Sequence, residues 1–183
     1  IDAGGCFGDT ALYFADVVGS SGKVYCYEFD PTNLVVYEHN MRINPGLSDR
    51  IQLVENALWS LPDREMHFLA DGAGTRLDPK DTNSPNGKTV LTDTIDAMVD
   101  RLGVAKVDFI KMDIEGAELD ALKGSRDTIQ RDRPKLAICL YHRLEHFWEI
   151  PKFIDSLDCG YKFWLGHFTI HAEETVLFAE AGR

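Results

Sequence analysis

The sequence predicts an α/β fold that is doubly wound around a mostly parallel sheet, with helices on both faces. Short β-rich runs alternate with longer amphipathic stretches, as strands and helices do in such folds. Residues 107–112 form a nearly unbroken apolar run, which is typical of a strand buried on both faces. The runs "YKFWLGH" and "TVLFAE" near the C-terminal end are expected to close the sheet as an antiparallel pair.

The length of 183 residues and the ordinary composition predict one domain over residues 1–183, with its first strand cut at the N-terminal end. The four cysteines form no C-x-x-C pair and lie in apolar or strand-like runs, which indicates buried thiols in a reducing, cytoplasmic compartment. No apolar run approaches the roughly 18 residues that cross a bilayer, so we expect no membrane association.

The formal net charge of -11 repels polyanions and therefore disfavours binding to nucleic acid. A small-molecule partner is the better expectation. The sequence gives no indication of an oligomeric state.

The N-terminal half contains three predicted strands, at residues 1–3, 24–29 and 51–54. A helix at residues 10–18 is expected to turn Ala11, Leu12, Phe14, Ala15 and Val18 toward the sheet. A second helix begins at Pro31, with Asp30 as its N-cap, and ends near residue 44. Residues 66–69, "MHFL", resemble a further short strand.

Residues 70–88 are rich in Gly, Pro, Asp and Asn and show no periodicity, which indicates a functional loop or lid. A short strand and a helix capped by Thr92 or Asp93 follow. The remaining predicted elements are a strand at residues 106–113, a helix at 115–129, a strand at 135–141 and a helix at 147–157 interrupted near Pro151.

Ligands of open α/β sheets bind at the carboxyl ends of the strands. Gly4 and Gly8, between the first strand and the first helix, allow a sharp turn and a close backbone approach to a ligand. The alternative is a tight turn without a ligand. The spacing D-x-G-x-x-x-G departs from the dinucleotide pattern G-x-G-x-x-G, so a pyrophosphate is not clearly indicated.

Glu28 ends the second strand about 20 residues after the glycines, the spacing at which an acid meets the two hydroxyls of a ribose. Its carboxylate can accept both hydroxyl hydrogens in charge-assisted bonds. The alternative is a solvated acid at a strand end. Phe29 is placed to lie against an adenine face.

Four segments of the sequence carry a resemblance to a known family: "IDAGGCFGDTALYFA", "VYCYEFDP", "VENALWS" and "VDFIKMDIEGAELDALKG". They resemble the FkbM-type S-adenosylmethionine-dependent methyltransferases, which have the class I Rossmann-like fold. The resemblance implies that Asp2, Gly4 and Gly8 cradle the methionine end of S-adenosylmethionine, that Glu28 holds its ribose, and that Asn56 and Ala57 lie near its adenine. Gly5 and Cys6 depart from the family, which commonly has a small residue followed by asparagine there.

The segment "KMDIEGAE" places Asp113 at a strand exit and Glu115 and Glu118 on one helix face. We expect Asp113 and Glu115 to bind the positively charged part of the cofactor or to face the substrate. We expect the negative charge of Glu118 to stabilise the N-terminus of the helix, as acidic residues in the first turn commonly do.

His142, just past a predicted strand, is a candidate general base because its ordinary pKa lies near neutrality. Asp113 is the rival base, and the alternative for His142 is a half-buried histidine bonded to backbone. His146, His167 and His171 are expected to be structural or surface residues. Asp113, Glu115 and His142 are chemically suited to a metal ion, but no tight spacing supports one, so we expect no metal.

The sequence therefore predicts methyl transfer from S-adenosylmethionine to a hydroxyl of a small molecule or sugar, the acceptor being implied by the resemblance alone. Two alternatives remain: an NAD-dependent oxidoreductase, and a cofactor-binding domain without turnover.

Overall fold

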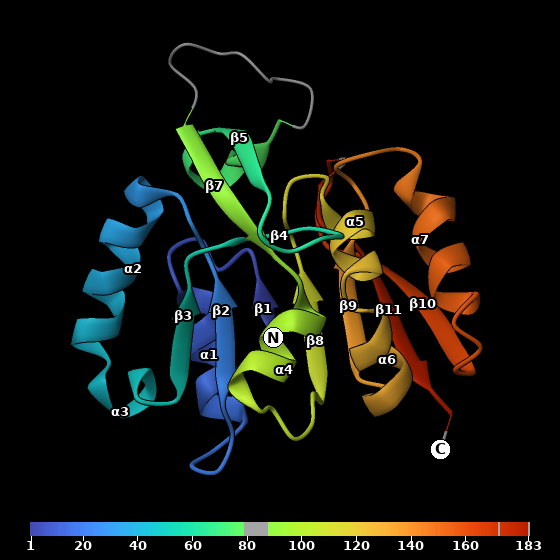
Figure 1. Cartoon of the computed structure of the whole chain (residues 1–183), viewed down its shortest axis with the longest axis horizontal. Coiled ribbons are helices and arrows are strands. Elements are labelled where there is room, and N and C mark those ends of the chain that lie inside the picture. Colours follow the sequence, from blue (N-terminus) through green and yellow to red (C-terminus); the bar gives the residue numbers. More distant parts are fainter. Residues whose placement is uncertain (79–87, 172, 183) are drawn as a thin grey trace. The chain divides into compact units, whose positions relative to one another are not determined.

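The computed structural model describes residues 1–78, 88–171 and 173–182 (Figure 1). Its larger sheet contains, in spatial order, β10 (Tyr161–His167), β11 (Thr175–Ala181), β9 (Lys135–Cys139), β8 (Phe109–Met112), β1 (Asp2–Ala3), β2 (Val24–Tyr27) and β3 (Ile51–Val54). This sheet is mostly parallel with antiparallel strands from the C-terminal end, which confirms the expected fold class. None of the helices within the described residues is both long and apolar enough to span a membrane.

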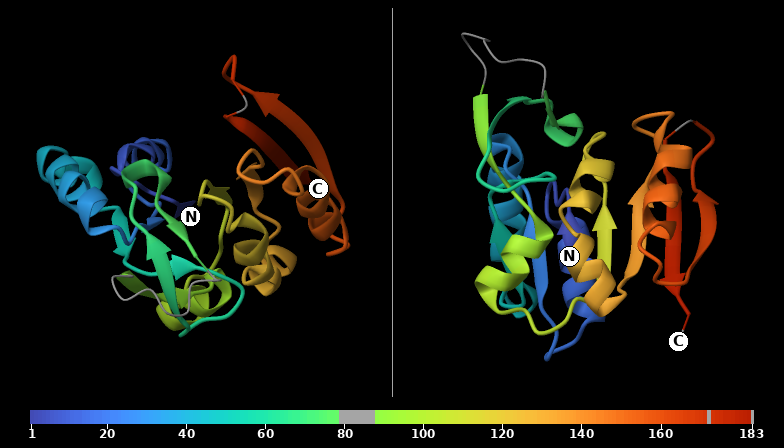
Figure 2. Two further views of the ribbon diagram at one scale, coloured as in Figure 1. Left: turned by 90° about the horizontal axis from the view of Figure 1, so that it is seen from above. Right: turned by 45° about the vertical axis from the view of Figure 1, so that its right-hand side comes forward.

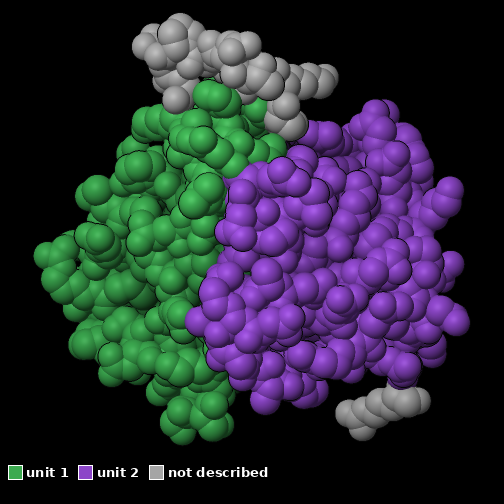
Figure 3. Space-filling view, in the orientation of Figure 1, with its two compact units in different colours: residues 1–57, 65–91 green, residues 58–64, 92–183 purple. Residues whose placement is uncertain are grey.

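The chain divides into two compact units (Figure 3). Unit 1 comprises residues 1–57 and 65–91, and unit 2 comprises residues 58–64 and 92–183.

In unit 1, β1 and β3 both pair in parallel with β2, with Asp2 opposite Cys26 and Val24 opposite Ile51. The helices of this unit are α1 (Asp9–Val17), α2 (Pro31–Ile43) and α3 (Pro45–Ser48). Its core consists of the buried residues Ala11, Ala15, Val24, Cys26 and Tyr37. Because β1 and β2 are parallel, the loops that follow them leave the same edge of the sheet.

The helix ends of unit 1 follow the sequence closely. Asp30 caps α2, since its Oδ1 accepts a hydrogen bond from the amide of Thr32 at 2.8 Å. The prediction that Val18 faces the sheet is wrong: α1 ends at Val17, and the Val18 side chain is 40% exposed. Val18 is the C-cap of α1, and its exposure contrasts with the complete burial of Ala11 and Ala15.

A smaller sheet has the spatial order β4 (Ala57–Leu58), β7 (Lys88–Asp93), β5 (Glu65–Leu69) and β6 (Arg76–Leu77). In it β5 pairs antiparallel with both β6 and β7. The expectation of a patternless loop from residue 70 is therefore wrong for its described part, which contains a 3₁₀ turn, η1 (Gly72–Gly74), and β6. The remainder of the expected lid, residues 79–87, lies outside the described residues.

In unit 2, β8 and β9 are parallel neighbours, and β11 pairs antiparallel with both β9 and β10. Helix α7 (His146–Asp155) packs beside β10 (Figure 2) and continues through Pro151, where an interruption was expected. Helix α4 (Ile95–Leu102) is capped by Thr94, not by Thr92 or Asp93, because Asp93 still belongs to β7. The Thr94 hydroxyl oxygen accepts from the amide of Ala97 at 3.0 Å.

The helix expected at residues 115–129 is in fact two helices, α5 (Glu118–Lys123) and α6 (Arg126–Asp132). Glu115 and Gly116 have φ of 54° and 94°, so neither continues a right-handed helix. At the break, Gly124 lies so close to the carbonyl of Trp59 that a Cβ would be 2.3 Å from its oxygen. A contact distant in sequence thus separates the two helices.

Candidate functional site

The glycine turn of unit 1 lies where β1 ends and α1 begins. Gly4 and Gly8 have φ of 82° and 79°, in the left-handed region that favours glycine. The Gly4 amide donates to the carbonyl of Tyr27, the last residue of β2, at 3.2 Å. Asp2 is fully buried beneath the turn, where its Oδ2 accepts from the Thr10 hydroxyl at 2.7 Å. The predicted residues Asp2, Gly4 and Gly8 are therefore together. Gly8 is buried, and a Cβ there would lie 2.6 Å from Met41 Cε, whereas Phe7 is the exposed side chain of the turn.

Gly5 and Cys6 complete the turn. A Cβ on Gly5 would lie 2.1 Å from Cys26 Sγ, so the space beside β2 excludes a side chain. Cys6 has a φ of 45°, which a residue other than glycine or asparagine rarely adopts. Gly5 has a packing reason that the sequence did not reveal.

Glu28 follows β2 and is buried, with 6% of the residue exposed. Its Oε1 accepts from the amides of Phe29 and Asp30 at 2.6 and 2.7 Å, and its Oε2 accepts from the Asn33 side chain at 3.2 Å. Burial raises the pKa of this carboxyl despite these hydrogen bonds. The carboxylate is held by the start of α2, with Oε2 carrying fewer of these bonds than Oε1.

A cavity of about 510 Å³ lies beside this loop within unit 1. The predicted residues Phe29 and Asn56 both line it, together with Phe68 and Lys88. The rings of Phe29 and Phe68 meet edge to face with centroids 5.0 Å apart. Ala57 does not line the cavity and is buried in β4. The cavity offers an aromatic wall and a few polar groups, as sites for planar ligands do.

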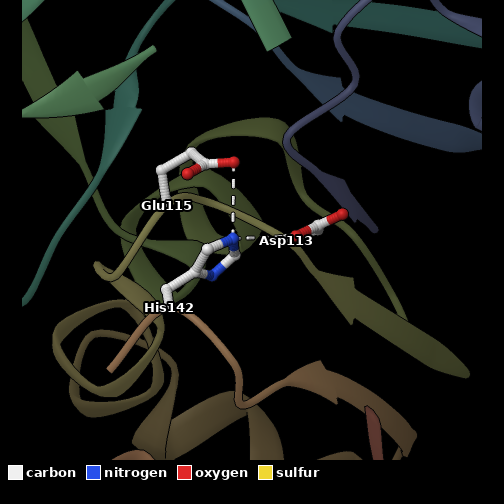
Figure 4. Close-up of side chains that lie close together, drawn as sticks. All are labelled: Asp113, Glu115 and His142. Atoms are coloured by element: carbon white, nitrogen blue, oxygen red, sulfur yellow. Dashed lines mark ion pairs between the residues drawn. The ribbon is translucent and has the colours of Figure 1, made fainter. Parts of the chain in front are cut away.

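Unit 2 contains an acid–histidine cluster, defined here as Asp113, Glu115 and His142 (Figure 4). Asp113 follows β8 and His142 follows β9, so the parallel pairing of these strands brings the two residues to the same edge. His142 Nε2 lies 3.5 Å from Asp113 Oδ1 and 3.3 Å from Glu115 Oε1. The structure therefore brings together three predicted residues that are up to 29 positions apart in sequence.

Glu118 contacts this cluster at the Nδ1 side of the His142 ring. Its side chain is completely buried, and Oε1 lies 2.7 Å from His142 Nδ1. The same oxygen accepts from the amides of Ile114 and Gly116 at 3.0 and 3.3 Å. His146 Nδ1 is 3.2 Å from Oε2 but outside hydrogen-bond geometry. Sequence reasoning assigned Glu118 only a helix-end charge; its spacing from the apolar Ala121 and Leu122 was the available sign that it faces the core.

The charges of the cluster determine its protonation. Burial lowers the pKa of His142, but the neighbouring carboxylates of Glu115 and Glu118 outweigh burial and raise it to about 10. Burial likewise raises the pKa of Glu118, but His142, His146 and the Ile114 amide outweigh it and lower this pKa to about 2. In the chain alone, His142 is therefore an imidazolium at neutral pH, a form that cannot accept a proton.

Tyr141 contacts the acid–histidine cluster; the sequence places it beside His142 at a strand end but assigned it no role. Its hydroxyl donates to Asp113 Oδ1 at 2.9 Å, and its ring centroid lies 4.1 Å from that of His142. Burial and the nearby Asp113 carboxylate raise the pKa of this phenol, so it remains a donor. The adjacency of Tyr141 to His142 at the end of β9 was the available signal.

The model of the methyltransferase FkbM domain family matches residues 2–163, which include every predicted site residue. No curated protein matches the chain in sequence.

Several solved structures are similar in fold. An FkbM methyltransferase from Methylobacillus flagellatus KT matches with a TM-score of 0.75 and 27% identity, over 97% of this chain and 42% of that chain. An rRNA methylase from Streptococcus thermophilus matches with a TM-score of 0.57 and 13% identity, over 100% and 85% of the two chains. An O-methyltransferase from Bacillus cereus, in complex with SAH, matches with a TM-score of 0.57 and 11% identity, over 99% and 72%. The chain thus spans less than half the length of the first of these proteins.

Proposed function

We propose, from the premise that the chain belongs to the FkbM methyltransferase family, that it transfers a methyl group from S-adenosylmethionine to a hydroxyl of a small molecule or sugar. The resemblance noted in the sequence is thereby confirmed. The observation that carries the proposal is that the family match runs through both the glycine turn and the acid–histidine cluster.

The four cysteines, none of which is in a disulfide, support a cytoplasmic location.

The cofactor is assigned to the strand ends of unit 1. Asp2, Gly4 and Gly8 are assigned to the methionine end, because the family match includes the turn between β1 and α1. Glu28 receives the ribose hydroxyls through Oε2, the oxygen with fewer internal hydrogen bonds. The cavity lined by Phe29 and Asn56 supports placing the adenine there, whereas Ala57 does not line it.

The acceptor chemistry is assigned to unit 2. Methyl transfer to oxygen is an in-line displacement: the hydroxyl oxygen bonds to the methyl carbon, the carbon–sulfur bond breaks, and the hydroxyl proton must pass to a base. Asp113 and His142 are the proposed catalytic residues. Since His142 is protonated in the chain alone, Asp113 is the better proton acceptor, with His142 holding its carboxylate.

Thermal unfolding with added ligands tests the cofactor assignment. S-adenosylhomocysteine (SAH) at 100 times its Kd stabilises by about 2.7 kcal/mol, which raises the unfolding midpoint by roughly 5–10 °C for a chain of this size. NAD is expected to cause no shift. Stabilisation by NAD and not by SAH would favour the oxidoreductase alternative and refute the proposal. SAH binding without turnover on any hydroxyl acceptor would favour the inactive domain.

The Glu28→Ala variant tests the ribose contact. Loss of charge-assisted hydrogen bonds worth about 1.5–3 kcal/mol weakens SAH binding on the order of 10–100-fold. Isothermal calorimetry measures the change. Glu38→Ala removes the same charge from the exposed side of α2 and serves as the control. Glu28→Gln, which keeps the side-chain shape, separates the loss of binding from a disturbed loop; wild-type affinity in both Glu28 variants contradicts the assignment.

A further inference from the structure

The acid–histidine cluster has the donor set of a metal site. Asp113 Oδ1, Glu115 Oε1 and His142 Nε2 come from two loops that follow the paired strands β8 and β9. One ligand atom from each residue lies within 4.8 Å of the others. Two carboxylate oxygens and one imidazole nitrogen suit divalent cations that accept both oxygen and nitrogen ligands.

The His142 ring supplies an independent indication of a ligand. Its side chain is only 7% exposed, and among the described residues Nε2 has no hydrogen-bond partner in good geometry. This buried nitrogen is aimed between the carboxylates of Asp113 and Glu115 (Figure 4). The carboxylates of Asp113 and Glu115 are 29% and 28% exposed, so solvent reaches both.

Glu118 orients the ring for such a ligand. Its Oε1 lies 2.7 Å from His142 Nδ1, and a carboxylate there selects the form in which Nδ1 carries hydrogen, which directs the lone pair of Nε2 toward Asp113 and Glu115. A carboxylate behind a ligating histidine is the usual outer support of metal sites. Glu118 also binds the amides of Ile114 and Gly116, and so supports the loop that carries Glu115.

The two distances from His142 Nε2 to the carboxylate oxygens are close to those between ligands of one ion, and the three donor atoms lie within 4.8 Å of one another. Ligands about 2.1 Å from a cation lie about 3.0–3.4 Å from one another in octahedral or tetrahedral geometry. The distances from His142 Nε2 to Glu115 Oε1 and to Asp113 Oδ1 are 3.3 and 3.5 Å. A pure ion pair would instead favour one carboxylate at about 2.7–2.9 Å.

Contrary to the expectation from the sequence that no metal binds, we propose that Asp113, Glu115 and His142 bind a divalent cation of the Mn²⁺ type, with Glu118 as a positioning residue. The cation takes the place of the proton on Nε2. Three protein ligands leave coordination positions open for water or for an acceptor oxygen. Binding of an acceptor oxygen to the cation rests on the proposed function, whereas binding of the cation does not.

Titration with Mn²⁺ tests the site. The chain is treated with a chelator, and bound Mn²⁺ is then followed by the loss of the electron paramagnetic resonance signal of the free ion. We expect one Mn²⁺ per chain, at least tenfold weaker binding in Asp113→Asn and His142→Gln, and 10–100-fold weaker binding in Glu118→Gln. Glu149→Gln removes an equal charge from the exposed face of α7 and is expected to bind like wild type.

The result is decisive in either direction. Absence of binding at millimolar Mn²⁺, or wild-type affinity in both Asp113→Asn and His142→Gln, overturns the site. Asp113→Asn changes a partly exposed carboxylate and so remains informative if a buried substitution unfolds the chain. SAH binding, measured on the same samples, separates the two proposals: binding of SAH without Mn²⁺ refutes only the metal site, and binding of Mn²⁺ without SAH refutes only the proposed cofactor.

Discussion

Gly5 and Cys6 show how single residues are chosen by their surroundings. Gly5 does not need a left-handed conformation; it needs the absence of a Cβ, because Cys26 Sγ occupies the space. Cys6, by contrast, has a positive φ of 45°. Asparagine, which the family commonly has at this position, adopts that conformation more readily than cysteine does. Cysteine is therefore less suited than asparagine to the backbone conformation of this position.

The packing at Gly5 predicts the effect of adding one methyl group. Gly5→Ala forces Cys26 or the turn to move and is expected to lower the free energy of unfolding by about 1–3 kcal/mol. Gly46→Ala, where a Cβ meets nothing within 4 Å and φ is ordinary, is the control and should change little. Urea unfolding measures both. Cys26→Ala in the Gly5→Ala background should recover part of the loss; no recovery contradicts the packing explanation.

At the scale of elements, the start of α5 connects local backbone with the site. Left-handed conformations at Glu115 and Gly116 end the loop after β8, and Glu118 then begins the helix with its side chain turned back toward that loop. The same carboxylate reaches His142 on the loop after β9. One buried side chain thus ties together two loops and a helix, and its removal affects all three.

Glu118 and His142 form a buried ion pair. In the chelator-treated chain, we expect this pair to make the free energy of unfolding depend on pH. The pKa of Glu118 is lowered from 4.5 to about 2, so its contribution is complete above about pH 4.5 and is lost as pH falls through 2. The pKa of His142 is raised from 6.5 to about 10, so its contribution is complete below about pH 6.5 and is lost as pH rises through 10. The pair therefore stabilises fully between about pH 4.5 and 6.5.

Glu118→Gln leaves a buried imidazolium without its nearest carboxylate, which costs about 3–5 kcal/mol at pH 6. The difference from wild type is expected to narrow as pH falls toward 2, because wild type then loses the same charge. Chemical denaturation at pH 6 and pH 3 measures it. Asp120→Asn, which breaks the more exposed pair with Lys123 on the same helix, should cost less than about 1 kcal/mol. Equal differences at both pH values would show that the charge is not responsible.

For the whole molecule, net charge bears on the class of acceptor. A fold shared with an rRNA methylase at 13% identity says nothing about the acceptor of this chain. The formal charge of -11 opposes the phosphate contacts on which binding to RNA depends. The charge therefore supports a small molecule or sugar as the proposed acceptor.

We expect a labelled RNA oligonucleotide to show no binding to the chain, even at low salt, where electrostatic attraction is strongest. Fluorescence anisotropy at about 20 mM and 150 mM salt measures this, with a basic RNA-binding protein as the positive control. Binding that weakens steeply with added salt would reveal a basic surface and contradict the prediction.

Elements that depend on neighbours along the chain were predictable. Asp30 before Pro31 specifies the start of α2, and Ala11 and Ala15 lie on one stripe of α1, because caps and helical faces involve residues within four positions. The sequence analysis missed the break between α5 and α6, which falls at Gly124 and Ser125, and only the fold shows that the carbonyl of Trp59 requires glycine there. The pairing of β5 with β7 was not predicted either, because the residues between these two strands show no pattern.

The sequence by itself determined the fold class, the family and the candidate residues Asp113, Glu115 and His142, because strand patterns, turns and motifs are written in short segments. Only the tertiary structure decided what those residues do to one another. The parallel pairing of β8 and β9 brings His142 between carboxylates, and burial of Glu118 beside it makes the ring a cation in the chain alone. Charge and coordination depend on distances across the fold, which are set when the strands pair.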